Sequence, residues 1–211
     1  ESAFLFNNLM LLGFAFAVFW GTIFPLVAEA VTGEKITVGP PFFEMVNFPI
    51  GLVLLALAGI GPVIAWRRAT KRNLRKNFAI PMGVLLAVAA GLWVGGARHP
   101  LALVTWSLCA FVLTVIGIEF WKGTRARARI EGEGYALALM HLVAHNRRRW
   151  GGYVVHVAMV MIYFGFAGAA YNVDERFHVQ PGDVVEVASP FGHTYVLTYE
   201  GLTVSIGKGE R

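Results

Sequence analysis

Five long stretches without a Lys, Arg, Asp or Glu side chain constrain most strongly how this chain can fold. They cover residues 3–28, 48–66, 78–97, 101–118 and 151–173. About 20 apolar helical residues cross a hydrocarbon core of about 30 Å, because each residue rises about 1.5 Å. A soluble chain of 211 residues has too few polar elements to cover several helices that are apolar on every side. We therefore predict a mainly α-helical membrane bundle of five spans within residues 1–173.

The basic residues are segregated between the links that join these stretches. Of 18 Lys and Arg, six lie in the link 67–77 and seven in the link 119–150. The links 29–47 and 98–100 hold one each. Basic links stay in the cytoplasm, so we expect the N-terminus on that side and the C-terminus outside. The net charge of +5 is then a topology signal, with anionic membrane lipid rather than nucleic acid as its expected contact.

After the last apolar stretch the sequence becomes alternating and is punctuated by turn residues. This pattern predicts strands at Val184–Ala188, Thr194–Tyr199 and Leu202–Ile206. Two or three strands are marginally stable alone. We expect residues 174–211 to form a small external β-region that either packs against the membrane part or is cut short.

Two segments near the membrane surface have local patterns of their own. The link 29–47 contains closely spaced Gly and Pro residues and then apolar ones, so we expect a compact external loop. In the link 119–150, apolar residues at 135, 139, 142 and 143 predict a helix lying along the surface. His141 and His145 lie one turn apart on it and share a face, which suits a metal ion, but no third ligand completes such a site. An interfacial position is the preferred interpretation for both.

His156 is the one histidine in any of the five apolar stretches. An ionisable side chain within a span is costly and is expected to face a protein interior, where it pairs, binds a ligand or moves protons. Helical spacing puts Gly152, Met159 and Tyr163 on the same face, and Gly152 leaves space for a flat ring. One interpretation is an axial haem ligand beside an apolar wall. A histidine hydrogen-bonded to a neighbouring helix and a proton-transfer group remain open alternatives.

Other recognisable chemistry is absent from the sequence. Cys109 is the only cysteine, and no CxxCH motif occurs, so this chain does not itself carry covalently attached c-type haem. No nucleophile and base at recognisable spacing, phosphate loop or dinucleotide fingerprint is present. No catalytic residue is therefore assigned.

Three passages together resemble a known family. They are Glu1-Ser2-Ala3-Phe4-Leu5 through Asn7-Asn8, Thr37-Val38-Gly39-Pro40-Pro41-Phe42-Phe43, and Arg149-Trp150-Gly151-Gly152-Tyr153-Val154-Val155-His156. The chain resembles the C-terminal portion of the CcmF-type subunit of cytochrome c haem lyase. The third passage is similar to the family segment that holds a transmembrane haem b ligand. Glu44 and Ala158 depart from the family pattern, which commonly has Asn and Gly there.

The resemblance implies a function within a larger assembly of the bacterial inner membrane. Such a lyase receives haem from the chaperone CcmE and joins its vinyl groups to the CxxCH thiols of an apocytochrome c. It works with apocytochrome-delivery and thiol-reducing subunits. Its b haem is implied to reduce the incoming iron, with quinol as a plausible electron source.

The same resemblance assigns expected roles to residues of this chain. His156 is expected to bind the iron of haem b, with Gly152, Met159 and Tyr163 facing the haem. The second axial ligand and the external haem-handling segment are expected outside this chain. The fragment alone is therefore expected to be inactive as a holocytochrome c synthase.

Two other classes of function remain open. A transporter or channel component would use Pro25, Pro62 and Pro81 to break helices around a binding site. A haem-binding anchor subunit of a respiratory complex would copurify with dehydrogenase partners rather than with maturation factors.

Overall fold

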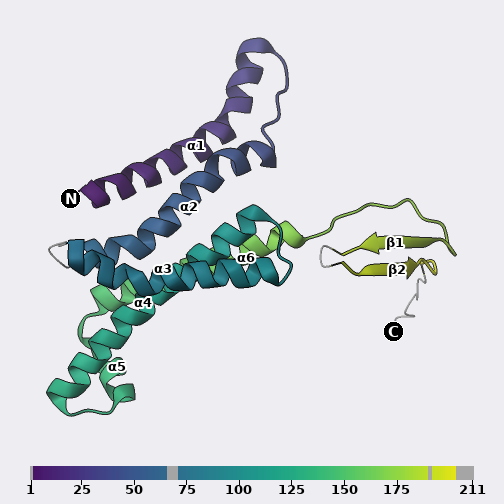
Figure 1. Cartoon of the computed structure of the whole chain (residues 1–211). Coiled ribbons are helices and arrows are strands. Elements are labelled where there is room, and N and C mark those ends of the chain that lie inside the picture. The colour runs from purple at the N-terminus through teal and green to yellow at the C-terminus, as the bar shows by residue number, and fades with distance from the viewer. Residues whose placement is uncertain (1, 66–70, 190–191, 203–211) are drawn as a thin grey trace, which may run out of the picture.

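The computed structural model describes residues 2–65, 71–189 and 192–202 of the chain. Within these residues, six α-helices are followed by a short 3-10 helix and a two-stranded sheet (Figure 1). The helices are α1 (Ser2–Thr32), α2 (Pro40–Ala65), α3 (Lys71–Val94), α4 (Pro100–Glu131), α5 (Tyr135–His145) and α6 (Arg147–Gly168). The remaining elements are η1 (Ala169–Tyr171), β1 (Val184–Ala188) and β2 (Thr194–Thr198).

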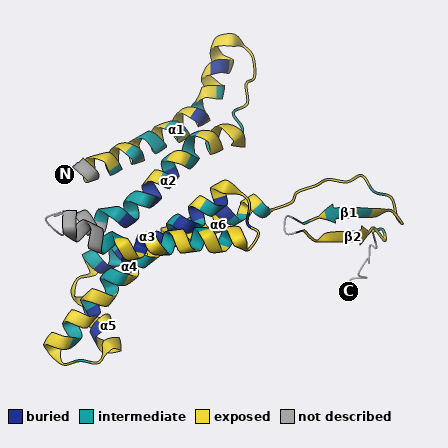
Figure 2. Cartoon of the chain, in the orientation of Figure 1, coloured by how far each residue is buried: buried dark blue, intermediate teal, exposed yellow. Residues whose placement is uncertain are grey.

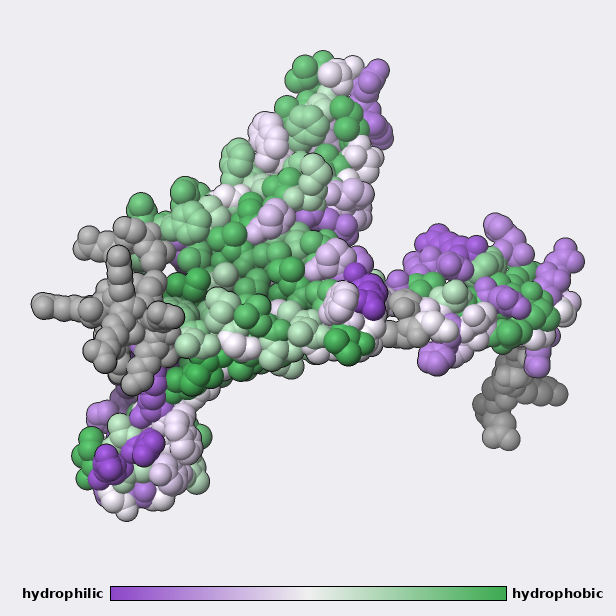
Figure 3. All heavy atoms as spheres, viewed as in Figure 1, coloured by the Kyte–Doolittle hydropathy of each residue, from purple (hydrophilic) through white to green (hydrophobic). Residues whose placement is uncertain are grey.

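In the described part of the chain, five helices are long and apolar enough to cross a membrane, which confirms the predicted multi-pass architecture. The candidate spans are Phe4–Thr32, Pro40–Gly61, Asn77–Val94, Pro100–Glu131 and Arg147–Tyr171, of which the last also includes η1. Large areas of these helices are exposed and apolar (Figures 2 and 3). Such surfaces suit lipid or further protein rather than water.

The fourth helix, α4, is the centre of the structure. It packs against α2, α3, α5 and α6, whereas α1 packs mainly against α2. Val112 and Val115 of α4 are fully buried in a core that includes Leu55 of α2 and Val160 of α6. A first side-chain carbon on Gly59 would lie 2.8 Å from the Phe111 ring. The absence of a side chain therefore lets α2 approach α4 closely, as is common between membrane helices.

The external link is shorter than the sequence pattern predicts. Its second half is helical, because α2 begins at Pro40 and already contains Phe42 and Phe43. Proline suits the first turn of a helix, where its missing N–H group has no partner to lose. The preceding helix α1 also continues to Thr32 and is followed by Gly33, whose left-handed φ of 72° ends it. The prediction of a loop over the whole of 29–47 is wrong for these reasons.

The helix α4 is longer than the apolar stretch 101–118 that predicts it. It continues to Glu131 and ends at Gly132, which has a left-handed φ of 67°. Its 32 residues correspond to about 48 Å, which exceeds the thickness of a hydrocarbon core. The following helix α5 folds back beside this extension (Figure 1), which confirms the helix predicted within the link 119–150.

The C-terminal part contains an antiparallel hairpin, with Val184 opposite Thr198 and Ala188 opposite Thr194. The first two predicted strands are thus confirmed, although β2 ends one residue early. The third predicted strand lies outside the described residues, except for Leu202, which is not in a strand. All of β2 is exposed, and the hairpin stands away from the helices (Figure 2). The start of the predicted link 67–77 also lies outside the described residues, and α3 begins at Lys71.

Candidate functional site

His156 lies in the middle of α6 and is partly buried. Its Nδ1 atom is 2.6 Å from the carbonyl oxygen of Gly152, one turn earlier in the same helix. Because a carbonyl oxygen only accepts hydrogen bonds, Nδ1 must carry the proton. The Nε2 atom then has the lone pair, and it takes part in no hydrogen bond with the described residues. This arrangement leaves Nε2 able to bind a metal ion or accept a proton.

The surroundings of His156 differ on its two sides. On one side, Tyr153 and Val160 of α6 are buried in the core. On the other side, Val155 and Ile162 are 59% and 58% exposed. No described atom lies within 4 Å of where a side chain on Gly152 would begin. The imidazole therefore sits at the boundary between the packed face of α6 and an uncovered apolar face.

The other two residues predicted to share this face have different environments. Met159 is 37% exposed and lies on the uncovered side. Tyr163 instead packs against the core, and its hydroxyl lies 3.1 Å from the position that a side-chain carbon on Gly51 would take. The structure thus brings Gly152 and His156 into direct contact and leaves Met159 nearby, while Tyr163 contacts α2.

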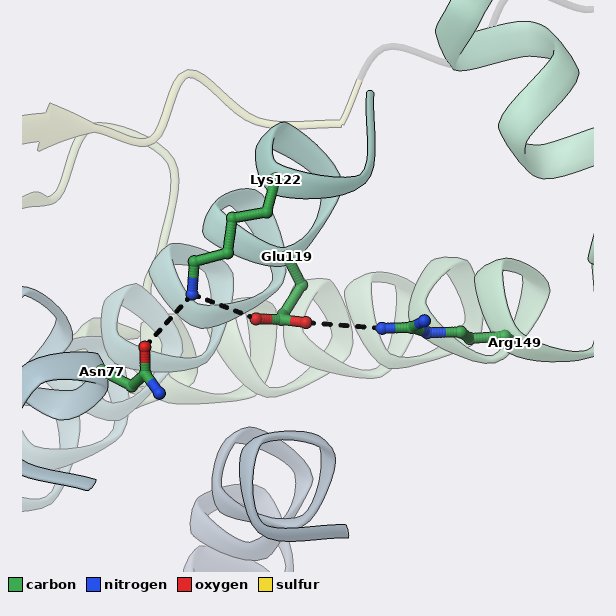
Figure 4. Close-up of polar contacts among 4 residues, drawn as sticks. All are labelled: Asn77, Glu119, Lys122 and Arg149. Carbon is green, nitrogen blue, oxygen red and sulfur yellow. Dashed lines mark hydrogen bonds and ion pairs between the residues drawn. The ribbon is translucent and has the colours of Figure 1, made fainter. Parts of the chain in front are cut away.

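Ion pairs and a hydrogen bond join three helices at the end of the bundle that carries α5, which we call the basic end. Glu119 of α4 contacts Lys122 at 3.3 Å and Arg149 of α6 at 3.5 Å (Figure 4). Lys122 also donates to the side-chain oxygen of Asn77 of α3 at 3.3 Å. The Glu119 carboxylate is only 18% exposed. The sequence places this glutamate near the interface, but nothing in its local pattern identifies Arg149 as its partner.

Comparison with curated proteins gives consistent matches over nearly the whole chain. The cytochrome c-type biogenesis protein ccl1 of Rhodobacter capsulatus is 33% identical over 200 residues, which are 93% of this chain and 28% of that protein. The chain belongs to the CcmF-type family of cytochrome c biogenesis proteins.

Other relatives are named cytochrome c-type biogenesis protein CcmF. The Pseudomonas fluorescens protein is 28% identical over 204 residues, 95% of this chain and 29% of its own length. The Escherichia coli protein is 24% identical over 215 residues, 100% of this chain and 30% of its own length. The CcmF-type chain thus spans less than a third of these relatives and corresponds to a C-terminal part of them. No family model and no solved structure matches it.

A second polar cluster of this CcmF-type chain joins α4 to α5. Nδ1 of His141 lies 2.9 Å from Glu133, whose other oxygen is 3.4 Å from Nε of Arg127. The pKa of the Glu133 carboxyl is lowered, first by the hydrogen bond with His141 and then by the nearby positive charges. Within the described residues, no group of three or more His, Cys, Asp or Glu could hold a metal ion. His141 thus has Glu133 as an acidic partner. His145 is not part of that pair and lines a cleft between α4, α5 and α6.

On the opposite end of the bundle, His99 precedes α4 and contacts η1. Its backbone N–H donates to the Tyr171 hydroxyl at 3.4 Å, and the two rings meet edge to face. Tyr171 also stacks on Trp106, whose indole N–H donates to the carbonyl oxygen of Phe164 at 3.0 Å. These contacts agree with a structural role for His99 at the end of α6.

Proposed function

We propose that this chain is part of the haem-handling membrane scaffold of a cytochrome c maturation protein, with His156 as an axial ligand of haem b. The observation that carries the proposal is the hydrogen bond between Nδ1 of His156 and the Gly152 carbonyl. Metal-bound histidines usually donate their other ring N–H to a fixed acceptor, which orients the ring. Here that bond directs the basic Nε2 atom away from the helix backbone.

The neighbouring residues have a shape and polarity that suit haem. Gly152 leaves open space one turn from the ligand, so a flat ring can lie close to α6. Val155, Met159 and Ile162 offer exposed apolar surface on the same side. Burial of a haem among such groups excludes water and helps to set its potential. When bound, a b-type haem supplies one-electron transfer.

The remainder of the site is expected from outside this chain. No other apolar stretch contains a histidine, so a second axial ligand requires another segment. The family resemblance supports a place beside CcmE, the apocytochrome-delivery and thiol-reducing subunits, apocytochrome c and quinol. It also supports the inner membrane, with the basic end in the cytoplasm and the C-terminal hairpin in the periplasm.

The transporter alternative depends on helices that break at proline. The structure shows α1 continuing through Pro25 and α3 through Pro81, and α2 runs past Pro62 to Ala65. This removes the feature on which that alternative rested.

A reduced-minus-oxidised visible spectrum of the full protein containing this chain tests the haem proposal. We expect a sharp b-type spectrum that His156→Ala abolishes while membrane insertion and thermal stability persist. His145→Ala on α5 is the matched control and should leave the spectrum unchanged. A protein without haem, or an unchanged spectrum in the His156→Ala variant, would contradict the haem proposal and indicate a structural role for His156.

A further inference from the structure

Three consecutive arginines begin α6, and they leave the helix in different directions. Arg149 is partly buried and contacts Glu119 of α4 at 3.5 Å (Figure 4). Arg147 and Arg148 are exposed, and neither makes an ion pair or hydrogen bond with the described residues. Successive helical residues are about 100° apart, so Arg147 and Arg148 lie about 180° and 80° from His156 around the axis. Arg148 is therefore closer than Arg147 to the face that His156 borders.

Arg148 lies at one end of the uncovered apolar face of α6. Residues 148, 152, 155 and 159 have the spacing that places them on one side of a helix. Gly152 has no side chain, and no described atom lies within 4 Å of where one would begin. Val155 and Met159 continue the face as exposed apolar side chains. Only the open position at Gly152 therefore separates Arg148 from the surface beside His156.

The spacing between Arg148 and His156 also suits a single bound group. The two residues are eight positions apart in one continuous helix, which is about 12 Å along its axis. Helical side chains lean toward the N-terminus, and the hydrogen bond to the Gly152 carbonyl holds the His156 ring beside the preceding turn. A ligand on Nε2 is then closer to Arg148 than the backbone spacing. The remaining separation is comparable with that between the iron of a haem and its propionate carboxylates.

The membrane surface is also where such carboxylates are expected. A charged group is costly in hydrocarbon, so a haem in a membrane protein favours an orientation with its propionates at the surface. The uncharged stretch of α6 begins at residue 151, so Arg148 lies at this boundary. Its position is fixed, because the Asn146 side chain accepts a hydrogen bond from the Arg149 backbone at 3.2 Å and Trp150 is buried in the core. A guanidinium can bind a carboxylate through two parallel hydrogen bonds.

We infer that Arg148 binds a propionate carboxylate of the haem b held by His156. The inference rests on the proposed function and adds the orientation of the haem to it. The propionate edge faces the basic end, and the vinyl edge lies deeper, along Met159 and Ile162. Arg149 has a separate task, because its contact with Glu119 joins α6 to α4.

The test measures haem binding by absorbance titration to the full protein containing this chain, after its own haem has been removed. Haem b is compared with its dimethyl ester, in which both propionates have lost their charge. Arg148→Gln should raise the dissociation constant of haem b about fivefold, the upper range for an exposed ion pair, and that of the ester less than twofold. Arg148→Lys should give an intermediate value, because an ammonium keeps the charge without the paired donors. Arg147→Gln is the matched control and should change either constant less than twofold.

His156→Ala separates this inference from the proposed function. If that variant binds both haems as the unsubstituted protein does, the proposed function is wrong and the inference fails with it. If binding requires His156, equal losses of both haems in Arg148→Gln would overturn the inference alone and indicate a structural role for Arg148. Equal losses of haem b in Arg147→Gln and Arg148→Gln would overturn it in favour of diffuse charge attraction. An unchanged constant for haem b in Arg148→Gln would do so in favour of a lipid phosphate as the contact of Arg148.

Discussion

Nδ1 of His156 lies 2.6 Å from the carbonyl oxygen of Gly152, so the histidine is oriented by the same glycine that leaves space beside it. An acceptor within the same helix needs no second element to hold the ring. The orientation of His156 is therefore independent of how α6 packs against other helices. Its Nε2 atom takes part in no hydrogen bond with the described residues.

Bulk at position 152 should interfere with haem binding more than bulk at the adjacent glycine. No described atom lies within 4 Å of a first side-chain carbon built at either Gly151 or Gly152, so the two positions are matched in local space. Gly152→Leu occupies the face of His156 and should lower haem b content about tenfold, as is typical for changes beside a metal ligand. Gly151→Leu points about 100° away and should have little effect. Equal haem content by pyridine haemochrome assay in both variants would argue against this face.

Gly123 should be intolerant of even one added carbon. A methyl group there would lie 2.5 Å from the Trp150 ring and 2.9 Å from Leu142. Overpacking of this kind costs about 1–3 kcal/mol, so Gly123→Ala should lower the free energy of unfolding by that amount. Gly117→Ala on the same helix meets nothing within 4 Å and is the control. Thermal unfolding in detergent gives both values, and equal stability of the two variants would contradict the packing described.

The contact between Glu119 and Arg149 should be stronger than the one between Glu119 and Lys122. The first pair is 18% and 28% exposed, whereas Lys122 is 41% exposed and is screened more by solvent. A double-mutant cycle with Glu119→Gln and Arg149→Gln should give a coupling energy of about 1 kcal/mol. The cycle with Lys122→Gln should give less than half of that. A larger coupling energy for Glu119 with Lys122 than for Glu119 with Arg149 would contradict this ranking.

Stability of the α4–α5 hairpin should fall in acid because of Glu133. Its pKa is below the ordinary value of 4.5, first because His141 donates a hydrogen bond to it. A carboxyl with a lowered folded-state pKa stabilises fully above its unfolded value and loses that contribution as the pH falls through the folded value. Amide hydrogen exchange of residues 135–145 is measured in the unsubstituted protein and in Glu133→Gln at each pH. Below about pH 4.5, the ratio of the exchange rate in the unsubstituted protein to that in the variant should rise. Parallel curves for the two proteins would exclude this contribution.

Hydropathy predicts the spans well because charged residues are costly in lipid, but it does not show where a helix ends. The extension of α4 beyond Ile118 is rich in Lys and Arg, which favour helix in water as much as apolar residues do. Only the left-handed Gly132 stops it. Likewise, Pro40 resembles a turn residue in the sequence and is the first residue of a helix in the structure.

The candidate site is likewise only partly predictable from the sequence. Helical spacing is enough to place Gly152 on the face of His156, because both belong to one element. Arg149 comes to Glu119 from another helix, and His141 comes to Glu133 across a turn. Such pairs depend on tertiary packing that local sequence does not encode. The local sequence does not predict the cleft beside Trp150 for the same reason. Gly123, which admits the Trp150 ring, is a local sign of this packing.

Because α4 is long, a small tilt of this helix moves its far end by a larger distance. The segment after Ile118 adds 13 residues, or about 20 Å, to the helix. Its first turn is still clamped against α3 and α6 through Glu119, Lys122 and Gly123. A tilt of about 10° within that clamp would carry the far end through about 3 Å, by simple proportion to this length. A rigid tilt of α4 would therefore displace α5 by a distance large enough to open or close a contact there.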